Sequence, residues 1–286
     1  MKRTILAGIL IVAAGGSAMV AQQKGNQKGA PAQSGQQKGP VAKSKGEQDA
    51  VVAMFNAQSN PDQMIAAAEN LLTKYADTEF QDTALFLEAS AYQRKGDADK
   101  AQVYAERALA ANPKNFQASL MLAESIAQRT RENDLDKEDR LARAEKYAND
   151  TIATLNVAEK PNPQMTDQQW GDIKKDLIAQ THDALGMSAM MRKKYDVAIN
   201  EFKMSVEGAA HPEPAYQVRL ASAYNGAGQY DDAIKLTEKV MGEADIPTQI
   251  KQVAQSIRAT ATVAKQKAAG GGGTPSAPPQ IEIKKP

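Results

Sequence analysis

A short pattern of small residues recurs three times along the chain, in RKGDADKAQVYAERAL, RKKYDVAINEFKMSV and GAGQYDDAIKLTEKV. When the three stretches are aligned on Gly96, Lys193 and Gly228, an alanine follows each of these residues after five positions. A second small residue precedes each of them by seven positions. A pattern that returns with fixed internal spacing indicates a structural unit that the chain builds several times. The small residues are Ala89 and Ala101, Gly186 and Ala198, and Ala221 and Ala233.

The composition favours a pair of closely packed helices as that unit. Apolar residues make up 42% of the chain, many of them alanine, and aromatic residues only 5%. Alanine has the highest helix propensity, and small residues let two helix axes approach each other. The runs of Val, Ile and aromatic residues that a sheet needs are scarce. Since one hairpin cannot bury its apolar face alone, neighbouring hairpins must stack.

Each position of the pattern has an expected place in such a hairpin. The small residue before the turn belongs on the first helix, and the alanine after the turn faces it from the second. Gly96 and Gly228 are predicted to end a first helix, where a residue with positive φ is often needed. Tyr92 and Tyr224, four positions before these glycines, are predicted to fill the space between neighbouring hairpins.

This pattern resembles the tetratricopeptide repeat family, whose unit is a 34-residue helix pair. Pro113, seventeen residues after Gly96, falls at the proline position of that family. The resemblance implies an all-α fold, an α-solenoid of stacked antiparallel helix pairs, over residues 47–267. About five repeats are expected, followed by a terminal capping helix. The first repeat, near 48–76, and the third, near 116–156, match less closely, and the third needs about nine extra residues in RTRENDLDKEDR.

Local signals place several helix ends. Asn60 and Pro61 are predicted to be the cap and the first helical residue of one helix. Thr166 and Gln169 form a capping-box pattern that opens a long helix towards Met191. Apolar residues recur at helical spacing from 247 to 267, which predicts the polar-faced helix that ends a repeat array. About eleven helices result.

The two ends of the chain differ from the repeats. Residues 1–21 have a basic start, an apolar run and then small residues, which is the layout of a secretory signal peptide. Cleavage after Ala18 and after Ala21 are both compatible with the sequence, and an uncleaved membrane anchor is the alternative. Residues 22–46 and 268–286 are rich in Gly, Gln, Lys, Pro and Ser, so a disordered linker and a disordered tail are predicted. We therefore expect an exported protein, either periplasmic or secreted.

Charge and cysteine content exclude several classes of protein. Residues 1–46 contain seven basic residues and no acidic one, whereas residues 47–267 contain 26 basic and 33 acidic residues. A mildly acidic body argues against nucleic acid as the partner, because phosphate binding needs a basic face. The chain has no cysteine, which excludes disulfides, thiolate metal sites and the cysteine that anchors a bacterial lipoprotein. Membrane association is expected only through an uncleaved signal or the basic linker.

No pattern for catalysis, a cofactor or a metal ion stands out. The two histidines, His182 and His211, lack the i, i+4 partner of a helical metal site. The run of glycines at 270–273 has no following helix to cradle phosphate. We therefore predict that the protein is not an enzyme and binds no cofactor.

The resemblance also implies a partner-binding surface, since first-helix residues of the family line a concave groove. A protein or peptide segment of unknown identity is the expected partner, and the chain is read as a protein-interaction scaffold of the bacterial cell envelope. The alternative is a structural spacer, associated with the envelope or the membrane and tethered by the basic linker. The oligomeric state is left open. The candidate groove residues are Phe86, Ser90, Gln93, Leu120, Glu124, Met187, Met190, Val218, Ser222 and Asn225.

Overall fold

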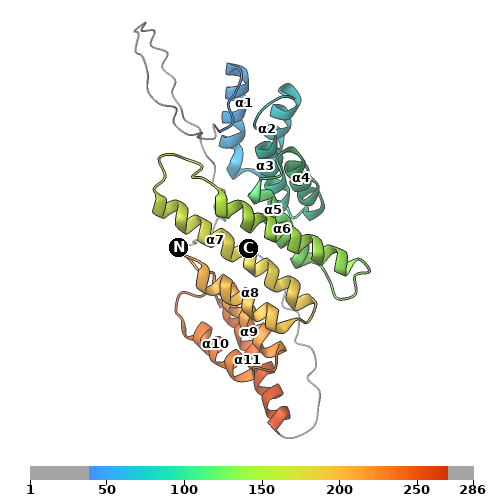
Figure 1. Cartoon of the computed structure of the whole chain (residues 1–286), viewed down its shortest axis with the longest axis vertical. Helices are drawn as coiled ribbons and strands as arrows, with labels where there is room; N and C mark the ends of the chain where they lie inside the picture. The colour runs from blue at the N-terminus through green and yellow to red at the C-terminus, as the bar shows by residue number, and fades with distance from the viewer. Residues whose placement is uncertain (1–38, 270–286) are drawn as a thin grey trace. The chain divides into compact units, whose positions relative to one another are not determined.

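The computed structural model describes residues 39–269, and this part of the chain contains eleven α-helices, one 3-10 helix and no strand (Figure 1). The described residues confirm the predicted all-α fold and the number of helices. The chain divides into two compact units, the first formed by residues 39–113 and 159–166 and the second by 114–158 and 167–269. The predicted signal peptide, most of the predicted linker and the tail after Ala269 lie outside the described residues.

The first unit contains four α-helices, in which α2 packs on α1 and α3, and α3 pairs with α4. Asn60 accepts hydrogen bonds from the backbone N–H groups of Asp62 and Gln63, and Pro61 is the first residue of α2, so the predicted cap is confirmed. The helices are α1 (Lys45–Asn56), α2 (Pro61–Lys74), α3 (Gln81–Arg94) and α4 (Ala98–Ala111), with the 3-10 helix Ala57–Ser59 between α1 and α2.

Helical structure begins earlier than the sequence predicted. We expected a disordered linker through residue 46, but α1 begins at Lys45, and Ser44 caps it by accepting a hydrogen bond from the Glu47 N–H. Before the helix, the Lys43 ammonium donates to Asp77 at 2.8 Å, and the Val41 N–H donates to Glu79 at 2.9 Å. The pattern Ser-x-x-Glu at 44–47 is itself a helix-start signal that the low-complexity composition obscured.

The second unit contains seven helices, and α5 pairs with α6, α7 with α8 and α9 with α10. The final helix, α11, packs on α9 and α10, where Ile250 and Ile257 close the core around Val218 and Val240. Among the described residues, α11 therefore covers the apolar face of the α9–α10 pair. The helices are α5 (Phe116–Arg129), α6 (Lys137–Val157), α7 (Asp167–Met191), α8 (Tyr195–Gly208), α9 (Pro214–Gly226), α10 (Tyr230–Gly242) and α11 (Thr248–Ala269).

The extra residues of the third repeat are divided between a loop and a helix. Residues 130–136 connect α5 to α6, and α6 has 21 residues, against 14 in the second helices α4 and α8. The next first helix, α7, is also long, with 25 residues. Near its start, Trp170 donates from Nε1 to the Ala158 carbonyl at 3.2 Å, which ties α7 to the end of α6.

The three aligned turn residues adopt the same backbone conformation. Gly96, Lys193 and Gly228 have φ values of 78°, 58° and 77°. After each of them, the next N–H donates to the carbonyl five residues earlier, on Tyr92, Ala189 and Tyr224 respectively. This is the Schellman ending of a helix, in which a residue in the left-handed region reverses the chain. The sequence alignment therefore placed Lys193 correctly, although lysine is an unfavourable residue for that conformation.

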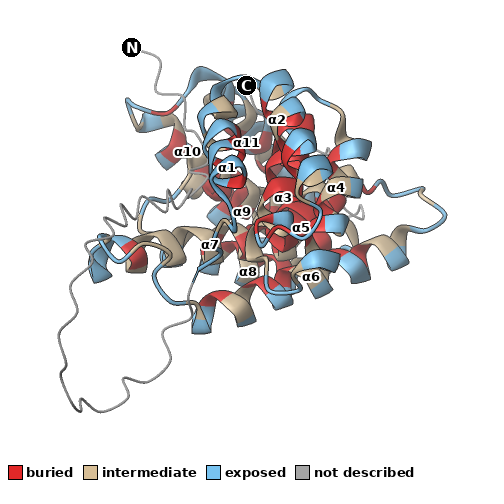
Figure 2. Ribbon diagram, turned by 90° about the horizontal axis from the view of Figure 1, so that it is seen from above, coloured by how far each residue is buried: buried red, intermediate tan, exposed pale blue. Residues whose placement is uncertain are grey.

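The small residues lie where paired helices touch. All six aligned Ala and Gly residues are buried, and Figure 2 shows buried positions recurring along the helices beside exposed ones. A Cβ atom added at Gly186 would lie 2.5 Å from the ring of Phe202, so α7 and α8 approach each other too closely for any side chain there. Tyr224 packs against the core of α8 and α9, as predicted. Tyr92 instead stacks on Tyr104 within its own hairpin, with ring centroids 5.2 Å apart.

Replacing Gly228 by alanine is expected to destabilise the protein through backbone strain alone. Nothing lies closer than 3.9 Å to a Cβ atom added there, so the cost is that of the left-handed conformation, about 1 kcal/mol. Gly242→Ala is the control, because Gly242 has no positive φ and an open surrounding. Urea unfolding of both variants tests this, and an equal effect of the two substitutions would contradict it.

Replacing Gly186 by alanine is expected to destabilise the protein by about 1–3 kcal/mol, because the new methyl group overlaps the buried Phe202 ring. Gly171→Ala on the same helix meets no atom within 4 Å and should stabilise α7 slightly, since alanine favours helix. Thermal unfolding of the pair measures the difference. If adding Phe202→Leu to the Gly186→Ala variant restores none of the lost stability, overlap with the ring is not the cause of the destabilisation.

Candidate functional site

A row of polar side chains connects the first helices of the second unit. From α7, Gln180 donates from Nε2 to Glu124 Oε1 of α5 at 2.7 Å. Asp183, one turn further along α7, accepts a hydrogen bond from the Arg219 guanidinium of α9. Asn225 of α9 then donates to the Thr260 hydroxyl of α11 at 3.3 Å. We call these six residues the polar ladder; it links α5, α7, α9 and α11.

The two carboxyl groups of the polar ladder are buried. Asp183 is 1% exposed and Glu124 8%, whereas the Arg219 side chain that pairs with Asp183 is 22% exposed. Burial opposes the charge of Arg219, but the charge and hydrogen bond of Asp183, together with Glu124, hold its pKa above the ordinary value. Burial, followed by the charges of Glu213 and Asp183, also raises the pKa of Tyr216 on α9. Arg219 therefore keeps its charge at all ordinary pH values, and its hydrogen bond to Asp183 joins α9 to α7.

The predicted groove residues of the second unit divide into buried and accessible ones. Val218 is 1% exposed and belongs to the core that α11 closes, and Asn225 is engaged by Thr260. Leu120 is also buried, and Glu124 is buried within the polar ladder. Half-buried positions that keep surface for a partner are Met187, Met190 and Ser222. The two methionines also pack against the core of α7, α8 and α9.

In the first unit, the predicted groove residues lie along α3. Phe86 and Ser90 are each 6% exposed, whereas Gln93, near the end of the helix, is exposed. The first two therefore offer a partner little surface, and Gln93 offers most. Their role in binding stays a prediction.

The sequence analysis did not identify three members of the polar ladder, namely Gln180, Asp183 and Arg219. Asp183 lies ten residues before Lys193, at the offset that Phe86 and Val218 have from their own turn glycines. The repeat alignment therefore contained the signal for Asp183, and Gln180 lies one turn before it. Arg219 carries no such signal, because its position follows from its pairing with Asp183 across two helices.

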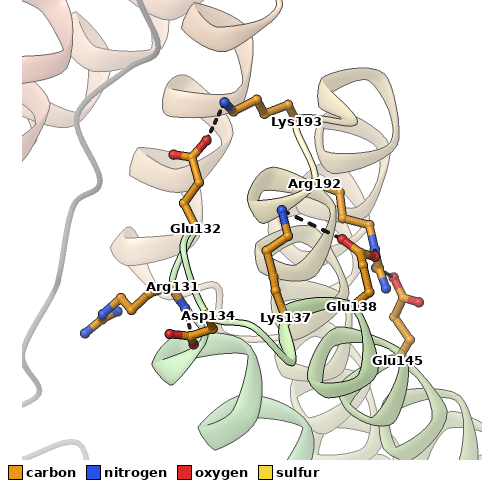
Figure 3. A network of polar contacts seen from close by, with 8 residues as sticks. All are labelled: Arg131, Glu132, Asp134, Lys137, Glu138, Glu145, Arg192 and Lys193. Carbon is orange, nitrogen blue, oxygen red and sulfur yellow. Dashed lines mark hydrogen bonds and ion pairs between the residues drawn. The ribbon is translucent and has the colours of Figure 1, made fainter.

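A second polar cluster, on the surface, ties the inserted loop to the end of α7 (Figure 3). Arg192 donates from Nε to Glu138 at 2.7 Å and also contacts Glu145, both on α6. Lys193 pairs with Glu132 of the loop at 2.5 Å. Hydrogen bonds from Arg192 and Lys193 lower the pKa values of Glu138 and Glu132. Arg192 is 12% exposed, but Glu138, Glu132 and Lys193 are about half exposed or more. Because ion pairs with exposed partners each contribute little, the cluster orients the loop more than it stabilises the fold.

Neither histidine takes part in a catalytic or metal-binding arrangement with the other. Nδ1 of His182 lies 2.7 Å from Glu201, and Nδ1 of His211 lies 2.8 Å from Asp176, whose hydrogen bond raises the pKa of His211. Within residues 39–269, no group of three or more His, Asp or Glu side chains is placed to hold a metal ion. None of the helices in that range has the length and apolar character needed to cross a membrane.

Stacked helix pairs with a shared turn geometry define this chain as a helical repeat protein. The sequence model of the tetratricopeptide repeat family matches residues 82–115, which form α3, α4 and the following turn. The crystal structure of TTC0263, a thermophilic TPR protein from Thermus thermophilus, is similar with a TM-score of 0.51 and 17% sequence identity. The similarity covers 74% of this chain and 98% of that one. No curated protein matches the sequence. Residues 82–115 therefore form a tetratricopeptide repeat, and the described part of the chain has a fold similar to that of a tetratricopeptide repeat protein.

Substitution of Arg219 by glutamine is expected to destabilise the second unit by ~3 kcal/mol, because it leaves the Asp183 carboxylate buried without its charged partner. Arg258→Gln is the matched control, since Arg258 and its partner Glu238 are both about half exposed, and it should cost less than ~1 kcal/mol. Urea unfolding provides both values. A double-mutant cycle with Asp183→Asn should give a coupling above ~1 kcal/mol, and additive effects would contradict the buried pair.

Proposed function

We propose that this protein is a non-catalytic scaffold that binds a protein or peptide segment on the first-helix face of its second unit. The observation that carries this proposal is the polar ladder with its accessible neighbours. Met187 follows Asp183 by four residues and Ser222 follows Arg219 by three, so each shares a helix face with a member of the ladder. A surface that mixes thioethers, a hydroxyl and fixed charges suits an extended or helical protein segment.

The place of action that we propose is the bacterial cell envelope. The support is the signal-like sequence of residues 1–21. The ordered contacts of Lys43 with Asp77 favour a scaffold over a tethered spacer. They hold one linker lysine against the protein itself, so that this lysine is partly engaged before it could meet an anionic surface.

Crosslinking of the full-length protein in intact cells, followed by mass spectrometry, tests the binding face. Partner crosslinks are expected on α5, α7 and α9. The substitutions Met190→Lys and Ser222→Arg should each reduce partner recovery about tenfold or more, because an unmatched charge at the centre of an interface is costly.

Met204→Lys provides the control for this experiment. Met204 is 52% exposed on α8, a second helix, so its substitution should leave recovery unchanged. Circular dichroism of each variant separates lost binding from lost fold. Full recovery with both face variants, or loss only with Met204→Lys, would refute the proposed face.

A further inference from the structure

Glu88 stands at a position that related repeats of this chain fill with leucine. It precedes Gly96 by eight residues, and Leu185 and Leu220 precede Lys193 and Gly228 by the same number. The structure places Glu88 in the interior of the first unit, with 0% of its surface exposed. Neither carboxylate oxygen has a hydrogen-bond partner among the described residues. A carboxyl group in such a place is costly when ionised.

The groups that face Glu88 do not neutralise it. Its helix, α3, packs against α2 and α4. From α4, the Tyr104 hydroxyl favours ionisation of Glu88, since it approaches the carboxylate without reaching hydrogen-bond geometry, and the charge of Arg107 acts in the same direction. From α2, the charge of Glu69 disfavours it. However, the Arg107 guanidinium lies over the Tyr104 ring, 4.8 Å from its centroid, and Tyr104 in turn stacks on Tyr92. Burial is the strongest influence, and it raises the pKa of Glu88 to about 7.

We propose that Glu88 makes the first unit responsive to pH: protonated, it packs as leucine does in the related repeats, and ionised, it loosens the packing of α3 against α2 and α4. The repeat that carries Glu88 is the one that the family model matches. A carboxyl group at a fully buried position is therefore a departure from an otherwise regular unit. The consequence is a first unit whose local opening depends on pH near neutrality.

The direction of the effect follows from the two states of the carboxyl group. In the unfolded chain Glu88 titrates near its ordinary value of 4.5, and in the folded unit near 7. Below 4.5 both states hold the proton and stability is highest. As the pH rises from 4.5 to 7 the unfolded state loses the proton first, so stability falls, and it stays low above 7. The opening equilibrium of the unit should increase on the order of a hundredfold over this range.

Amide hydrogen exchange of the full-length protein tests the proposal. The exchange rates of the α3 and α4 amides are measured and corrected for the pH dependence of intrinsic exchange. Protection in the wild type should fall on the order of a hundredfold between pH 5 and pH 8. Glu88→Gln and Glu88→Leu should each abolish most of that change and raise protection at pH 8. Glu207→Gln, at an exposed position of α8, should retain the wild-type profile.

Two results would overturn the proposal. One is a pH profile of α3 and α4 that persists in both Glu88 variants. The other, which needs no variant, is a carboxyl-carbon NMR titration that places Glu88 of the wild type near 4.5. A titration midpoint near 7, together with loss of the pH profile in either folded variant, would establish it.

Discussion

The close approach of paired helices at small residues is the constraint from which the rest of this fold follows. At Gly186 the ring of Phe202 occupies the space that a side chain would take, and Ala221 and Ala233 are completely buried. Helices that touch in this way bury most of their inner surface without large side chains, which explains a core with few aromatic residues. Each hairpin still leaves one face open, so a neighbouring hairpin, or finally α11, must cover it.

The periodic part of the fold was predictable from the sequence because it depends on local spacing. The shared offsets identified Gly96, Lys193 and Gly228 as equivalent turn residues, and all three have positive φ. The start of α1 was not predicted, because the composition before Lys45 concealed a capping pattern. The stacking of Tyr92 on Tyr104 was also missed, since a ring can turn towards its own hairpin or the next one without any change of spacing.

The candidate site was predicted less well than the fold, for a physical reason. The family register identifies which helix face a residue occupies, but exposure depends on what covers that face. Val218 lies at a groove position and is nevertheless enclosed by α11. Asp183 and Glu88 interrupt a pattern of apolar or small residues with buried carboxyl groups. Only tertiary contacts distinguish the two, because Asp183 pairs with Arg219 whereas Glu88 has no hydrogen-bond partner among residues 39–269.

The contact between α7 and α8 can be observed directly by NMR of the full-length protein. If a glycine proton occupies the space against an aromatic ring, the Hα resonances of Gly186 should be shifted upfield by the ring current, with nuclear Overhauser effects to the ring protons of Phe202. Glycine resonances at ordinary positions, with no Overhauser effect to that ring, would contradict the packing on which the whole account depends.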